Sequence, residues 1–78
     1  MTRAQLEAIC LASLDAGKDF IELEIPGDPS ARRCRLFGHH TGPRGTVIGW
    51  NGNNVTCRFD ASKVLEYIDT LPIDSEII

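Results

Sequence analysis

Histidines and cysteines are the residues of this chain whose types could support nucleophilic chemistry. His39 and His40 are adjacent, and an imidazole beside a thiol is a common way to activate a nucleophile. The three cysteines, however, occupy positions that we expect to face the interior, where a thiol is usually inert. These residues are Cys10, Cys34 and Cys57. No close pair of carboxylates suggests acid–base chemistry either, so the sequence predicts a protein that is not an enzyme.

The glycine-rich segment around the two histidines also gives little support for a metal or phosphate site. No acidic residue occurs between positions 29 and 59, so His39 and His40 lack carboxylates at ligand spacing. The stretch Gly42-Pro43-Arg44-Gly45 lacks the phosphate-loop pattern and leads into a predicted strand, not into a helix N-terminus. We therefore expect no metal and no cofactor, and we regard the histidines as contact residues.

Cysteine number and the N-terminal sequence lead to an expectation about compartment. Three cysteines at wide spacings argue against a disulfide framework, and without a C-x-x-C pair they argue against zinc. The N-terminus shows no apolar signal-peptide core, and no apolar run approaches the roughly 20 residues of a membrane span. We expect reduced, buried cysteines in a cytoplasmic protein (the host cytoplasm, if the gene is carried by a phage) that does not contact a membrane.

The charges are segregated along the chain, although the net charge is only −3. All 11 acidic residues lie before position 29 or after position 59. The segment between them carries arginines at positions 32, 33, 35, 44 and 58. Such asymmetry indicates a charged partner, and the forked guanidinium suits carboxylates and phosphates alike. The predicted partner-binding residues are Arg33, Arg35, His39, His40, Arg44 and Arg58.

Two helices are predicted at the ends of the chain. Thr2 and Gln5 have the spacing of a capping box, and the apolar residues that follow recur at helical spacing, which predicts a helix over residues 3–16. Asp60 is the predicted N-cap of a second helix over residues 61–70. The tail, residues 72–78, is too short to assign, and its two final isoleucines either dock or form an interface.

Four strands are predicted between the helices, over residues 19–25, 31–37, 45–50 and 54–59. The last two flank Asn51-Gly52, a strong hairpin signal. In that hairpin we expect Ile48 and Trp50 on the side of Val55, and Val47 on the opposite side.

These elements predict one α+β domain, residues 1–78, in which a four-stranded antiparallel meander is flanked by the two helices. The meander could also curl into a small SH3-like barrel. If the first two strands pair, Arg33 and Arg35 face Glu22 and Glu24, and ordinary cross-strand ion pairing would then account for two of the arginines.

Two classes of function fit this description. One is a protein-binding module that meets an acidic or nucleic-acid-handling partner. The other is a small domain that binds nucleic acid directly through its arginine-rich sheet face and loop. The overall acidity counts against the second class, because binding to phosphates usually comes with a basic domain.

Two resemblances add to this picture. The stretch from Gly45 to Asp60 resembles the strand–turn–strand of KOW and SH3-like modules, which implies a nucleic-acid-binding fold. The whole chain is similar to the short accessory proteins of bacteriophages and prophages, in its single acidic domain without a catalytic motif and in its strand-to-helix end at residues 58–68. Anti-CRISPR proteins belong to that group, so the resemblance implies an inhibitor that covers a surface of a host nucleic-acid-handling complex. No residue motif defines the group, and no residue roles follow from it.

Overall fold

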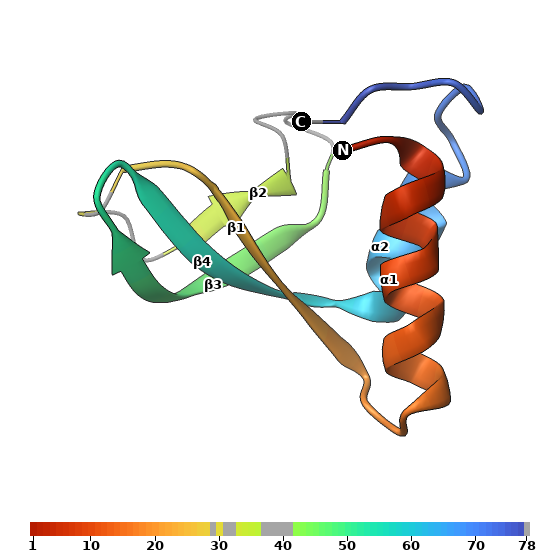
Figure 1. Cartoon of the computed structure of the whole chain (residues 1–78), viewed down its shortest axis with the longest axis horizontal. Coiled ribbons are helices and arrows are strands. Elements are labelled where there is room, and N and C mark those ends of the chain that lie inside the picture. Colours follow the sequence, from red (N-terminus) through yellow and green to blue (C-terminus); the bar gives the residue numbers. More distant parts are fainter. Residues whose placement is uncertain (29, 31–32, 37–41, 78) are drawn as a thin grey trace.

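The computed structural model describes residues 1–28, 30, 33–36 and 42–77. In these ranges the chain forms two helices and four strands (Figure 1). Their bounds are α1 (Arg3–Asp15), β1 (Phe20–Pro26), β2 (Arg33–Arg35), β3 (Arg44–Asn51), β4 (Asn54–Asp60) and α2 (Ala61–Ile68). The predicted α+β class, with an antiparallel sheet between an N-terminal and a C-terminal helix, is confirmed. The second helix ends before the predicted residue 70, and β2 is shorter than predicted.

The sheet has the strand order β1-β4-β3-β2, with every neighbouring pair antiparallel. The last three strands form the expected meander, but β1 pairs with β4 and not with β2. β1 and β4 are both 7 residues long, and their register sets Ile21 opposite Phe59 and Leu23 opposite Cys57. This pairing buries one apolar row on each strand, which the short β2 could not match. No described residue of β1 pairs with β2, so the sheet is not closed into a barrel.

This order corrects the predicted ion pairs between the first two strands. Glu22 lies opposite Arg58, whereas Arg33 lies opposite Thr46. Ordinary pairing with the glutamates of β1 therefore does not account for Arg33 and Arg35.

The predicted hairpin joins β3 and β4, and Gly52 takes the positive φ of 60° that its turn requires. Trp50 lies opposite Val55, as expected. Val47 lies opposite Cys57, so the expectation that it faces the other side is wrong. The register shifts between Val47 and Gly49, which adds an extra residue to β3 and reverses the facing before the bulge.

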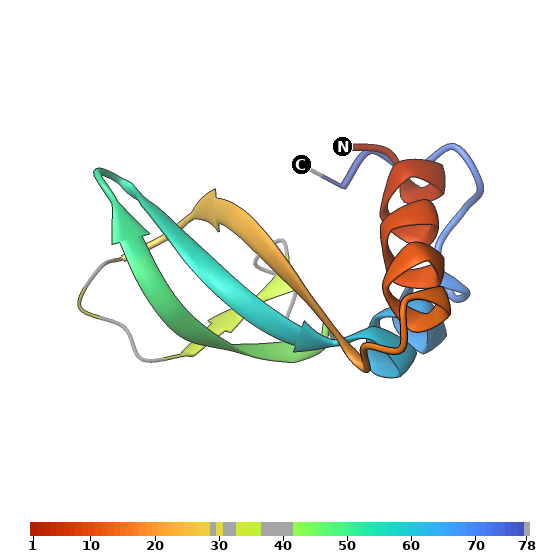
Figure 2. The same ribbon diagram turned by 60° about the horizontal axis from the view of Figure 1, so that its bottom comes forward.

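The two helices pack side by side at one end of the sheet (Figures 1 and 2). The predicted capping box of α1 is present: Thr2 Oγ1 accepts from Gln5 N at 3.2 Å, and Gln5 Oε1 accepts from Thr2 N at 2.8 Å. Asp60 caps α2 by accepting from Lys63 N at 3.1 Å. Both helices contribute to one core with the inner sheet face, through Leu6 and Cys10 of α1 and through the buried side of α2.

The C-terminal tail docks beside the start of the chain. Ile77 N donates to Met1 O at 2.7 Å, and the Met1 ammonium contacts Glu76 Oε1 at 2.7 Å. Ile77 is buried in the core, which settles the open alternative for this residue in favour of docking. Ile78 lies outside the described residues.

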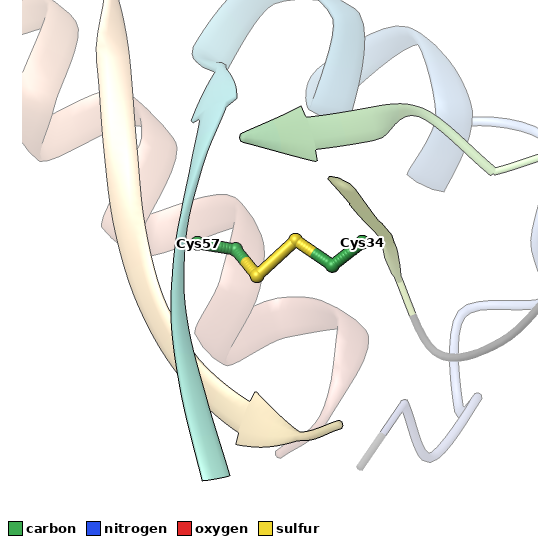
Figure 3. Close-up of a disulfide and its surroundings, with 2 residues drawn as sticks. All are labelled: Cys34 and Cys57. Carbon is green, nitrogen blue, oxygen red and sulfur yellow. A yellow bond between two sulfur atoms is a disulfide. The ribbon is translucent and has the colours of Figure 1, made fainter. Parts of the chain in front are cut away.

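A disulfide joins Cys34 of β2 to Cys57 of β4 across the intervening strand (Figure 3). The expectation of three reduced cysteines is therefore wrong for this pair, and only Cys10 is a free, buried thiol. Their separation of 23 residues belongs to no local motif, so the sequence alone gave no signal for the bond. Disulfides are typical of oxidising compartments, and the cytoplasmic location stays a prediction.

Gly45 explains how β2 and β4 come close enough for this bond. The two cysteine Cα atoms are 6.7 Å apart, although next-but-one strands of a flat sheet are separated by roughly 9 to 10 Å. Gly45 lies opposite Cys34 on β3, and a Cβ atom there would come within 2.7 Å of the Phe59 ring. The missing side chain lets the sheet fold over β3.

Candidate partner-binding surface

Four arginines lie on the outer face of the sheet, away from the core. Side chains of partner residues in antiparallel strands share a face. Thr46 of β3 is opposite both Arg33 and Arg58, and Arg44 is opposite Arg35. We call Arg33, Arg35, Arg44 and Arg58 the arginine face. It includes four of the six residues predicted to bind a partner, and the strand pairing brings them together on three adjacent strands.

Arg58 is held in place by two neighbours on β1. Its Nη2 contacts Glu22 Oε1 at 2.7 Å, and its guanidinium carbon lies 4.3 Å from the centroid of the Phe20 ring. The ion pair is exposed, so its contribution to stability is about 0 to 1 kcal/mol. Glu22 balances the charge of Arg58. The guanidinium group therefore offers a partner a fixed, flat surface and little net positive charge.

Arg35 and Arg44 form a pair of like charges directly across β2 and β3. Arg35 Nη1 donates to the carbonyl oxygen of Gly42 at 3.2 Å, which directs this side chain along the loop that enters β3. Arg44 is exposed. Like charges in this position destabilise a strand pair, and an anion bound between the two guanidinium groups would relieve the repulsion.

Arg33 completes the basic edge of the sheet. It is exposed on β2, two residues before Arg35. Within the described ranges, neither Arg33 nor Arg44 makes an ion pair.

The acidic residues of the outer face lie at the opposite edge, on β1. Glu22 pairs with Arg58, and Glu24 Oε1 accepts from Asn51 Nδ2 at 3.1 Å and from Asn54 Nδ2 at 3.4 Å. The outer face is thus acidic at the β1 edge and basic over β3 and the β2 edge. Sequence reasoning missed the roles of Phe20 and Glu22 beside Arg58, because these contacts depend on the pairing of β1 with β4.

His39 and His40, the other two predicted contact residues, lie outside the described residues, and their part in the surface stays a prediction. Among the residues that the structure describes, no three His, Cys, Asp or Glu side chains are grouped as metal ligands would be. No helix in the described part of the chain is long and apolar enough to cross a membrane.

Comparisons with known proteins add no assignment. No family model, no curated protein and no solved structure matches the chain.

Proposed function

We propose that this protein is a non-catalytic binding module that docks its arginine face on an acidic surface of another protein. The observation that carries the proposal is the grouping of exposed Arg33 and Arg44 with Arg35 on two paired strands. A cluster of like charges gains from an anionic partner. Carboxylates match the guanidinium fork in two parallel hydrogen bonds, and arginine is enriched at the energetic centres of interfaces.

We further propose that the partner is a nucleic-acid-handling complex of a host cell, and that the protein acts as an inhibitor of the phage type. The support is the likeness to phage accessory proteins in the short, acidic single domain, the lack of a catalytic motif and the strand-to-helix end. An inhibitor that works by covering a surface needs a rigid face and no catalytic groups. The arginine face meets the first need, because it lies on paired strands, and strands position side chains more accurately than loops.

The test is capture from bacterial lysate with immobilised protein, with and without nuclease treatment. The variant Arg33→Glu/Arg35→Glu/Arg44→Glu removes the basic edge. Arg44→Glu alone has a matched control in Lys18→Glu, which makes the same charge change at an exposed position outside the sheet. We expect a discrete complex that survives nuclease, is lost with the triple and Arg44 variants, and is kept with Lys18→Glu. The same proteins captured by all variants would refute the proposal.

Direct nucleic-acid binding is the second candidate, and the Arg58–Phe20 contact favours it. A cation stacked on an aromatic ring beside further arginines resembles the platforms that bind single strands. Against it stand the net charge of −3 and the glutamates at the β1 edge. Capture that disappears with nuclease, together with affinity for a labelled oligonucleotide that falls steeply with salt, would favour this candidate.

A further inference from the structure

A shallow groove lies between α2 and the segment that enters β3. It is lined by Pro43, Lys63, Glu66, Tyr67 and Thr70, and its volume is about 420 Å³. Pro43 immediately precedes Arg44. Along the chain, the groove and the arginine face therefore adjoin at the start of β3.

Local contacts fix the walls of the groove. The carbonyl of Pro43 accepts from Leu36 N at 3.2 Å, which ties this wall to the end of β2. On the other wall, the Thr70 hydroxyl donates to the carbonyl of Tyr67 at 2.7 Å. Tyr67 is partly buried against the core, and burial raises the pKa of its hydroxyl. The walls are therefore held in place before any ligand arrives.

The chemistry of the groove suits a side chain of a peptide better than a nucleic acid. A proline ring and a tyrosine ring offer apolar surface. Lys63 adds a positive charge and Glu66 a negative one, so the groove itself is nearly neutral and suits an apolar group. Ligand pockets range from about 300 to 1,000 Å³, so about 420 Å³ has room for an apolar side chain.

We propose that this groove receives an apolar side chain from the same acidic segment of the partner protein that binds the arginine face. This inference rests on the proposed function and specifies the ligand: an extended peptide segment in which acidic residues are followed within a few positions by a large apolar residue. Charge complementarity with Arg44 and Lys63 selects the acidic part. Pro43 and Arg44 are neighbours, with Cα atoms about 3.8 Å apart, but successive side chains of an extended chain point to opposite sides. The peptide must therefore pass around the start of β3, which takes a few residues.

The experiment uses two fluorescent peptides, each with a run of glutamates followed by glycine, one ending in leucine and the other in glycine. Fluorescence anisotropy with the wild-type protein should show about tenfold tighter binding of the leucine peptide, the gain expected from burying most of one leucine side chain. Tyr67→Ala should remove this preference, and Tyr67→Phe should keep it. Equal affinity of the wild-type protein for the two peptides would overturn the inference.

Two exposed positions provide a test that does not depend on the folding of the Tyr67 variants. Lys63→Gln should weaken binding of both peptides, and Glu66→Gln should strengthen it, because the two substitutions change the local charge in opposite directions. Changes of the same sign would contradict the inference. Tighter binding of an oligonucleotide than of either peptide, or self-association of the protein that Tyr67→Ala abolishes, would also overturn it by naming a different occupant.

The arginine variants separate this inference from the proposed function. If Arg44→Glu abolishes binding of both peptides while leucine gives no advantage in the wild type, the arginine face stands and the groove does not. If Arg44→Glu leaves both affinities unchanged, the proposed function itself is wrong.

Discussion

Removing the disulfide between Cys34 and Cys57 should lower the stability of the whole domain. The bond closes a loop with a sequence separation of 23 residues. In the chain-entropy treatment of a cross-link, a loop of this length restricts the unfolded chain by about 3.4 kcal/mol at 25 °C. For a domain of 78 residues, each kcal/mol corresponds to about 4 to 8 °C in Tm. Loss of the bond should therefore lower Tm by roughly 14 to 27 °C.

The assay is thermal unfolding followed by circular dichroism, with and without a phosphine reductant. Wild-type protein should lose stability on reduction. The variant Cys34→Ala/Cys57→Ala should unfold at a similarly low temperature and should not respond to the reductant. Cys10→Ala serves as the matched control, because it removes the free thiol and should keep the response of the wild type.

Reduction should also weaken partner binding at temperatures where the reduced protein is still folded, because it loosens β2. β2 carries Arg33 and Arg35, and its ladder with β3 contains only three residue pairs. Besides this hydrogen-bonded ladder, the disulfide to Cys57 is a covalent restraint that ties the strand to β4. An unchanged Tm on reduction, or three alkylated cysteines in the native protein by mass spectrometry, would refute the reasoning.

Three further predictions concern single positions. Gly45→Ala should destabilise the protein by about 1 to 3 kcal/mol in urea unfolding, because its Cβ atom would lie 2.7 Å from the Phe59 ring and 2.9 Å from a backbone oxygen; Gly49→Ala, whose nearest neighbour is 4.0 Å away, should cost far less, and equal losses would contradict the packing argument. Arg58→Ala should cost about 1 kcal/mol through the lost contacts with Glu22 and Phe20, and a double-mutant cycle with Glu22→Ala that shows no coupling would count against the ion pair. Burial and the nearby Glu7 raise the pKa of the Cys10 thiol from 9.0 to about 11. The folded protein therefore favours the protonated thiol, and the stability of the domain should be unaffected by this group below pH 9.0 and should fall as the pH rises to about 11. A stability profile of Cys10→Ala with the same loss over this range would show that another group is responsible.

The element types could be predicted from the sequence because each has a local cause. The capping box at Thr2 and Gln5 and the turn at Asn51-Gly52 are interactions between residues a few positions apart, and both are present. The pairing partner of β1 could not be predicted in this way. It depends on matching strand lengths and apolar rows that lie more than 30 residues apart, as in the pair Glu22–Arg58.

The candidate surface was predictable in its residue types and not in its geometry. Segregation of charge pointed to the arginines without any knowledge of the sheet. Their assembly on one face depends on the register of β2 with β3 and on the bulge in β3, which the alternation of residue types does not show. The groove beside Tyr67 was missed because Pro43 and α2 are joined only by the tertiary fold.

The placement of opposite charges at the two edges of the outer sheet face gives the molecule an electrostatic orientation. Glutamates lie at the β1 edge, and Arg33 and Arg44, which make no ion pair within the described residues, lie on β2 and β3. Under the proposed function, an acidic partner would therefore orient this domain before any contact forms. Association steered in this way is fast at low ionic strength and slows as salt screens the field. The arrangement would therefore act on the rate of encounter as well as on the lifetime of the complex, and a partner of the wrong charge would be turned away from the binding edge during diffusion.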